Sequence, residues 1–311
     1  MSNRNPLDYS INKPISSGYS PIKYVLKDIP LFVSLLGVLT FGLIMLYSSS
    51  GQSLSMVIRQ SVYVTLGLSL MTFISHLKPD SYKNILMHSY WVGISLLIYV
   101  LLNPAEGYST SRWINLGFFQ FQPSEIIRLI LPLSLVAYLC RKDSPVKLFD
   151  WFYTTLAALI CSYLVFRQPD LGTSIIVLTS GLIPIYLAGL PIKIMMAYLA
   201  ILLVTMPMVW TNLLEYQKQR VLTYFDNNVD PLGDGWNIAQ SQTAIGSGGI
   251  FGKGYLEGTQ SQLNFIPESH SDFIFSVIGE EFGLIGILLL FALYTFIILS
   301  LIHISEPTRQ W

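Results

Sequence analysis

Long apolar runs dominate the chain and alternate with shorter polar segments. A helix needs about 20 apolar residues to cross a bilayer. Eight runs approach this length, and we predict transmembrane helices at residues 29–47, 60–75, 85–102, 126–139, 151–166, 171–190, 194–214 and 273–298. The second, fourth and fifth runs are short and need flanking residues to complete a span. The pattern predicts an all-α, polytopic integral membrane protein.

The composition supports this prediction. Hydrophobic residues make up 52% of the chain, charged residues only 12%, and the mean hydropathy is +0.54. Soluble domains usually have about 25% charged residues. The formal net charge is zero, which gives no reason to expect nucleic acid as a partner. The two cysteines, Cys140 and Cys161, do not suggest a disulfide framework.

The distribution of Lys and Arg predicts the topology, because cytoplasmic loops carry an excess of both residues. Only Arg59, Arg112 and Arg167 lie in short loops on one side. Ten basic residues lie on the other side: Arg4, Lys13, Lys23, Lys27, Lys78, Lys83, Arg141, Lys142, Lys147 and Lys193. We therefore predict a cytoplasmic amino terminus, with residues 1–28 as a flexible cytoplasmic tail.

Four segments then lie outside the membrane: residues 48–59, 103–125, 167–170 and 215–272. The last segment, between the seventh and eighth predicted helices, is much the longest and contains most of the groups able to do chemistry. Its final polar residue, Asp272, is expected where water meets lipid. A carboxylate at this level can act on a substrate whose tail is in the bilayer and whose head is in water.

Residues 299–310 resemble the translation of a transposase sequencing adapter. We expect genuine sequence to stop near Ile298 and residues 299–311 to be an adapter-derived artefact. A natural short cytoplasmic tail is the alternative. The predicted transmembrane domain therefore comprises residues 29–298.

Four polar blocks on the predicted outer side resemble motifs of the SEDS family (shape, elongation, division and sporulation), the bacterial peptidoglycan glycosyltransferases. The blocks are residues 111–117 with 121–125, residues 168–173, residues 230–254, and residues 267–275 with 279–283. Residues 258–263 look like the elongation branch of the family rather than the division branch. The resemblance covers roughly residues 25–298.

The resemblance implies a fold, a substrate and partners. The family has ten membrane helices, so a chain with eight is expected to be truncated, and whether the truncated chain is active stays open. The implied substrate is lipid II, a disaccharide-pentapeptide on undecaprenyl diphosphate. The implied partners are a class B penicillin-binding protein, which is a transpeptidase, and membrane proteins of the elongation complex. The implied location is the bacterial cytoplasmic (inner) membrane.

The resemblance also implies a reaction, in which the 4-hydroxyl of one sugar attacks the anomeric carbon of another and the lipid diphosphate leaves. A base that takes the hydroxyl proton contributes roughly 10²–10⁴-fold. Asp272 matches the essential aspartate of the family, and we assign it the role of general base or of ligand to Mg²⁺ or Mn²⁺. A structural alternative is that Asp272 caps the eighth helix.

Charge bears on how the diphosphate is held. Residues 215–272 contain three bases against seven acids, a net charge of −4 that should repel a diphosphate. Either basic side chains converge on the substrate or a divalent cation bridges carboxylate and phosphate. The candidate substrate-binding residues are Arg112, Trp113, Arg167, Arg220, Lys253 and His270. Trp113 and His270 also suit plain structural roles, as an interfacial anchor and a hydrogen-bonding residue.

The glycine-rich segment 246–254 does not satisfy the phosphate-binding P-loop pattern. That pattern requires a glycine where Ser247 stands and Ser or Thr where Gly254 stands. The glycines are instead expected to allow tight turns and close backbone approach in a re-entrant or surface segment. Contact between Lys253 and phosphate stays open.

Three charged residues fall inside predicted membrane helices, where charges are costly and usually paired. They are Arg128, Glu280 and Glu281. Arg128 lies one turn into its helix and Glu280 about two turns into the eighth helix, and both helices start on the outer face. We predict an ion pair between Arg128 and Glu280 or Glu281 that ties the fourth helix to the eighth.

Two functions other than glycosyl transfer stay open. A lipid II flippase would be favoured by inverted repeats and broken helices, and neither is apparent in the sequence. A non-catalytic scaffold for a class B penicillin-binding protein would not need the Asp272 carboxylate.

Overall fold

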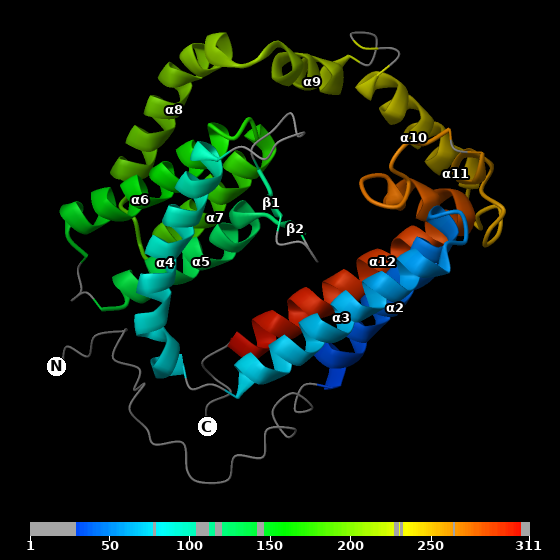
Figure 1. Ribbon diagram of the computed structural model, residues 1–311, viewed down its shortest axis with the longest axis horizontal. Helices are drawn as coiled ribbons and strands as arrows, with labels where there is room; N and C mark the ends of the chain where they lie inside the picture. The colour runs from blue at the N-terminus through cyan, green and yellow to red at the C-terminus, as the bar shows by residue number, and fades with distance from the viewer. Residues whose placement is uncertain are drawn as a thin grey trace. The chain divides into compact units, whose positions relative to one another are not determined.

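The computed structural model describes residues 29–76, 79–103, 112–115, 120–141, 146–226, 230, 233–263 and 265–305. The predicted cytoplasmic tail lies outside the described residues. The chain divides into two compact units, one within Leu77–Leu213 and the other within Ser17–His76 and Leu214–Trp311 (Figure 1). Each unit is described by itself.

The first unit is a helical bundle with a small β-hairpin. Its elements are α4 (Pro79–Leu102), β1 (Ile114–Asn115), β2 (Gln120–Phe121), α5 (Pro123–Leu139), α6 (Leu148–Phe166), α7 (Leu171–Leu187) and α8 (Ile192–Asn212). Helix α5 packs against α4 and α7, and α6 packs against α7. The two strands are antiparallel, with Ile114 opposite Phe121.

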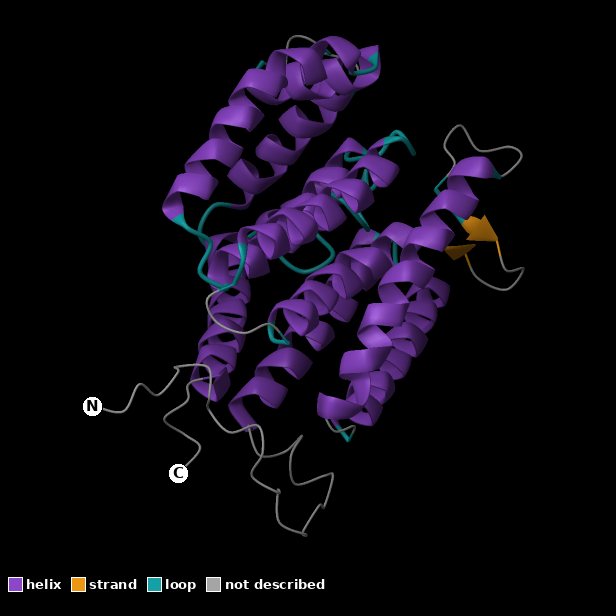
Figure 2. Cartoon of the chain, turned by 90° about the vertical axis from the view of Figure 1, so that its left-hand side faces the viewer, coloured by secondary structure: helices purple, strands orange, loops and turns teal. Residues whose placement is uncertain are grey.

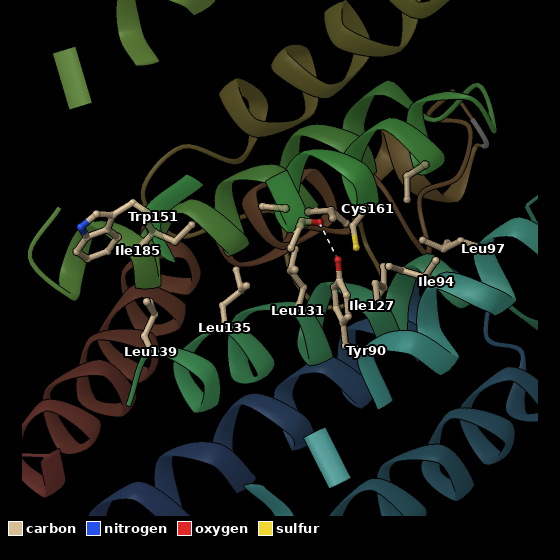
Figure 3. Close-up of a cluster of buried hydrophobic side chains, with 14 residues drawn as sticks. Tyr90, Ile94, Leu97, Ile127, Leu131, Leu135, Leu139, Trp151, Cys161 and Ile185 are labelled. Carbon is tan, nitrogen blue, oxygen red and sulfur yellow. Dashed lines mark hydrogen bonds between the residues drawn. The ribbon is translucent and has the colours of Figure 1, made fainter. Parts of the chain in front are cut away.

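The core of this unit contains both apolar and polar contacts. Leu131, Ala158 and Cys161 are fully buried, and the Tyr90 hydroxyl donates a hydrogen bond of 3.2 Å to the Ala157 carbonyl (Figure 3). Small hydroxyl residues also join α6 to α7 through hydrogen bonds of 2.9–3.0 Å. In a bilayer the hydrophobic effect does not drive helices together, because lipid tails are as apolar as the side chains. Close packing and interhelical hydrogen bonds of this kind stabilise the helix contacts instead.

The second unit contains both ends of the described chain. Its helices are α2 (Ile29–Ser49), α3 (Leu54–Ser75), α9 (Glu215–Phe225), α10 (Asp234–Gly248), α11 (Thr259–Gln262) and α12 (Ile274–Ser305). Helix α12 packs against α2 and α10, and α2 also contacts α3. Met45, Val277 and Ile278 are buried between α2 and α12, and Phe282 meets Phe41 edge-on.

The eight predicted membrane helices are confirmed as α2 to α8 and α12, and the all-α prediction holds except for the short β-hairpin (Figure 2). Among the described residues, six helices are long and apolar enough to span a membrane; α5 and α7 have 17 residues each and are shorter. Helices α3 and α8 have no buried residue, as expected of surfaces that face lipid. The predicted outer loop 215–272 is about half helical, since it contains α9, α10 and α11.

Helix α12 is broken at Gly283, where φ is 61° and ψ is −156°. Residues 249–254 lie along residues 280–285, and four backbone hydrogen bonds of 3.0–3.2 Å join the two segments. These bonds supply partners for polar groups that the break removes from the helix, as a membrane environment requires. The prediction of a continuous eighth helix is therefore wrong at Gly283. The expectation that glycines permit close backbone approach is confirmed, because a Cβ on Gly252 would overlap the backbone of Glu281.

Candidate active site at the amino end of α12

Asp272 lies in a tight turn directly before α12. The Glu268 carbonyl closes this turn by accepting hydrogen bonds from the backbone N–H groups of Ser271 (3.1 Å) and Phe273 (3.3 Å). Asp272 is exposed, and within the described residues of its unit the carboxylate has no hydrogen-bond or ion-pair partner. Helix α12 begins at Ile274, so Asp272 is not its cap and the capping alternative is wrong. The carboxylate is free to act on a substrate.

The turn is anchored to the end of α2. Ser269 is buried, and its hydroxyl donates a hydrogen bond of 2.9 Å to the carbonyl of Ser49. His270 is exposed, with Nε2 3.8 Å from Oε2 of Glu268. Among the described residues, no group of three His, Cys, Asp or Glu side chains could hold a metal ion. A cation at Asp272 would therefore take most of its oxygen ligands from other sources, such as water and substrate phosphate, as Mg²⁺ commonly does.

Glu280 lies on α12, and its side chain is fully buried. One carboxylate oxygen accepts hydrogen bonds from Lys253 Nζ (2.7 Å), Thr259 Oγ1 (3.1 Å) and the backbone N–H of Gln260 (2.9 Å). The other accepts the backbone N–H of Ser261 at 3.2 Å. The carboxylate is thus satisfied from residues of its own unit.

The predicted ion pair of Arg128 with Glu280 or Glu281 would join the two units and stays a prediction. Within its own unit, Arg128 pairs with Glu125, three residues earlier on the same helix face. The crossing of segment 249–254 at the α12 break brings Lys253 to Glu280, so the buried charge is satisfied from within its own unit by a residue 27 positions away in the chain. Two of the three N–H donors of the Lys253 ammonium are used by Glu280 and Thr259, so its predicted contact with a diphosphate stays a prediction that depends on the third.

Glu281 is also buried and accepts a hydrogen bond from the hydroxyl of Ser48 at the end of α2. The side-chain amide of Gln262 donates to the carbonyl and hydroxyl oxygens of Ser48 at 3.3 and 3.2 Å. Within the described residues, Oε2 of Glu281 has no hydrogen-bond partner. This small network joins α2, α11 and α12.

Replacing Ser48 with alanine is expected to lower the free energy of unfolding by about 1–3 kcal/mol, because it removes a donor from a buried carboxylate. Thermal unfolding of the purified protein in detergent measures this change. Ser69→Ala is the matched control: its exposed hydroxyl bonds only the Thr65 carbonyl of its own helix, 2.8 Å away. That variant is expected to stay within about 0.5 kcal/mol of wild type. Equal stability of the two variants would contradict the role of Ser48.

Tyr255 adds an anchor between the glycine-rich segment and α2. Its hydroxyl donates a hydrogen bond of 3.1 Å to the carbonyl of Ile44. Burial raises the pKa of Tyr255, and the nearby Glu281 carboxylate raises it further. The phenol therefore stays protonated at neutral pH and keeps its donor.

In the first unit, Arg112 braces the loop between α6 and α7. Its Nε donates to the Gln168 carbonyl at 3.1 Å, its Nη2 donates to the Pro169 carbonyl, and its Nη1 lies 3.7 Å from Oδ2 of Asp170. Asp170 also accepts the backbone N–H of Thr173 at 3.2 Å and so caps α7. The sequence analysis did not predict that Asp170 caps α7, although an aspartate before an apolar run is a known capping signal.

The remaining candidates are accessible. Trp113 is 38% exposed, Arg167 is exposed with Nη1 3.2 Å from the Tyr163 hydroxyl, and Arg220 is exposed on α9. The seven predicted catalytic and substrate-binding residues divide between the units: Arg112, Trp113 and Arg167 in the first, and Arg220, Lys253, His270 and Asp272 in the second. Their convergence on one substrate stays a prediction.

Comparison with known proteins decides the family. The family described as "Cell cycle protein", which comprises FtsW, RodA and SpoVE, matches residues 29–311. The chain belongs to this family. It is the SEDS family that the motifs around Asp272 and Arg112 predict.

Two curated relatives illustrate the breadth of this SEDS match. Peptidoglycan glycosyltransferase MrdB of Escherichia coli (strain K12) is 39% identical over 283 residues, covering 91% of this chain and 76% of the relative. Probable peptidoglycan glycosyltransferase FtsW of Aliivibrio salmonicida (strain LFI1238) is 30% identical over 287 residues, covering 88% and 71%.

Two solved structures share the fold. One is described as "Structural coordination of polymerization and crosslinking by a peptidoglycan synthase complex". It has a TM-score of 0.71 and 30% identity, and the match covers 87% of this chain and 76% of that one. The other, Rod shape determining protein RodA of Thermus thermophilus, has a TM-score of 0.59 and 26% identity, covering 87% and 72%.

Proposed function

We propose that this SEDS protein is a peptidoglycan glycosyltransferase that polymerises lipid II during cell elongation. The observation that carries the proposal is the Asp272 carboxylate, which is exposed and unpartnered within the described residues of its unit. The rest of its turn is held by hydrogen bonds through Glu268 and Ser269. A free carboxylate on a fixed support is what general base catalysis requires. The 39% sequence identity to peptidoglycan glycosyltransferase MrdB of Escherichia coli supports the same reaction.

In the proposed step, the carboxylate of Asp272 accepts the proton of the acceptor 4-hydroxyl as its oxygen attacks the anomeric carbon of the donor sugar. A new glycosidic C–O bond forms, the C–O bond to the lipid diphosphate breaks, and the diphosphate leaves with the bonding electron pair. Alternatively, Asp272 holds a Mg²⁺ or Mn²⁺ ion, which when bound would neutralise the leaving diphosphate.

The break in α12 is the one observation that favours the alternative of a lipid II flippase, since discontinuous helices are common in transporters. Backbone groups at this break, however, are bonded to residues 249–254. Paired groups are not available to coordinate a ligand. The break is therefore better explained as the place where segment 249–254 crosses α12. Glycosyl transfer stays the leading function.

The setting of the reaction belongs to the same proposal. We place the chain in the bacterial cytoplasmic membrane, with its amino terminus inside and Asp272 outside, because of the Lys and Arg distribution. A class B penicillin-binding protein is the proposed partner. The match to a structure described as a synthase complex that coordinates polymerization and crosslinking supports such a transpeptidase.

The deciding experiment reconstitutes the full chain in liposomes with lipid II and the class B partner. Glycan strands separated by gel electrophoresis are the expected product. A second assay follows fluorescent lipid II across the bilayer. Translocation without polymer would support the flippase, and loss of both activities in a folded protein would leave the scaffold role.

A further inference from the structure

Glu280 has no part in the proposed chemistry, yet it is a fully buried carboxylate on a membrane helix. Such a charge is costly unless several donors satisfy it. We propose that Glu280 is a positioning residue that fixes the turn carrying Asp272, so that its loss impairs catalysis without removing any group that touches substrate. This inference rests on the proposed function.

The donors around Glu280 come from one short stretch of chain. Two are the backbone N–H groups of Gln260 and Ser261 in the first turn of α11, which have no partner inside that helix. The hydroxyl of Thr259 and the ammonium of Lys253 complete the set. Lys253 also donates to Thr259 at 2.7 Å, so the donors hold one another in place. One carboxylate thereby fixes the start of α11 and the end of the glycine-rich segment.

Glu280 also fixes the far end of the same excursion, because it is part of α12. From α11, which contacts α12 through Glu280, the chain continues through the turn that contains Asp272 and then enters α12 at Ile274. Glu280 thus joins both ends of the segment 259–274 at its base. Ser269 and Gln262 add contacts to the end of α2 along the way. Without the base contact, the turn keeps its own closing hydrogen bonds and these side contacts, but its placement relative to α12 is less tightly fixed.

Catalysis is sensitive to such displacement, because a shift of about 1 Å can lower a rate by about 100-fold. In Glu280→Gln an amide NH2 group replaces one of the two carboxylate oxygens. This group donates and cannot accept, so it would face a donor that has lost its acceptor. We expect kcat for lipid II polymerisation to fall by about 10- to 100-fold with KM little changed. The enzyme is the full chain reconstituted with lipid II and its class B partner.

The matched control is Glu281→Gln, at the neighbouring buried carboxylate. An amide oxygen there can still accept the Ser48 hydroxyl, so wild-type kcat is expected. A role in folding alone would lower the yield of folded protein in Glu280→Gln but leave kcat per folded molecule unchanged.

A second readout follows the turn itself. A nitroxide label on a cysteine at exposed position Ser271, with Cys140 and Cys161 replaced by serine, reports local mobility by electron paramagnetic resonance. The label is expected to become more mobile with Glu280→Gln and not with Glu281→Gln. If Glu280→Gln does not fold, Thr259→Val removes one donor and is expected to give a smaller loss of kcat with the same direction of mobility.

The outcomes separate the two proposals. Failure of the folded wild-type chain to polymerise lipid II would overturn the proposed function for this chain. An active wild type with an inactive Asp272→Asn, alongside wild-type kcat and label mobility in a folded Glu280→Gln, would overturn the positioning role alone. Where only Thr259→Val folds, wild-type kcat and mobility in that variant would overturn it as well.

Discussion

Replacing Asp272 with asparagine is expected to lower the rate of lipid II polymerisation by about 10²- to 10⁴-fold. The amide has nearly the same shape as the carboxylate but cannot accept the proton of the attacking hydroxyl. Stability is expected to stay near wild type, because within the described residues of its unit the exposed side chain makes no hydrogen bond that the change would remove. The measurement is kcat at saturating lipid II, with thermal unfolding as a check on folding.

The matched control is Glu215→Gln, at an exposed acid at the start of α9. Its carboxylate lies 2.9 Å from Lys218 Nζ, and a surface pair of this kind contributes about 0–1 kcal/mol. Wild-type activity is expected. Titration with Mg²⁺ or Mn²⁺ then separates the two roles of Asp272: a lost cation ligand would raise the concentration needed, whereas a lost base would not. Full activity in Asp272→Asn would contradict both roles.

Replacing Gly283 with alanine is expected to destabilise the second unit strongly. The backbone conformation at this residue, φ 61° and ψ −156°, is nearly exclusive to glycine and costs other residues on the order of 1–3 kcal/mol. An added Cβ would also overlap the backbone nitrogen of Gly252 and lie 2.7 Å from the carbonyl oxygen of Ile250. The crossing of segment 249–254 would have to open, which adds to the loss. A large fall in Tm measured in detergent is the expected result.

Gly67→Ala on α3 is the control for this substitution. Nothing lies within 4 Å of an added Cβ there. Alanine in a helix interior is favoured over glycine by roughly 0.5–1 kcal/mol, so Tm is expected to stay level or rise. A Gly283→Ala protein as stable as Gly67→Ala would show that the break in α12 is not a fixed feature of the fold.

The predicted helices were confirmed because the bilayer sets a length that apolar runs must meet. Helix α2 was predicted to within two residues at its carboxyl end, and α12 to within one at its start. The predicted artefact at residues 299–311 is untested, and α12 continues through Ser305. Burial also required that Glu280 and Glu281 find partners, and that part of the prediction held.

The identity of those partners was beyond the sequence. The predicted helix starts place Arg128 and Glu280 at similar depths below the outer membrane face. Their opposite charges were the only further ground for pairing them. Lys253 reaches Glu280 only because the backbone crosses at Gly252 and Gly283, a contact between segments far apart in the chain. Glu125 lies three residues before Arg128, so the i, i+3 spacing was a signal for that pair.

The sequence by itself determined the class of protein, the family and Asp272 as the residue to test, because these depend on composition, span length and local motifs. Only the tertiary structure decided that the Asp272 carboxylate is free in its unit while Glu280 is fully engaged. A motif names residue types, but whether a carboxylate is exposed or surrounded by donors depends on how distant segments pack. The break in α12 and the hydrogen bonds of residues 249–254 provide that packing.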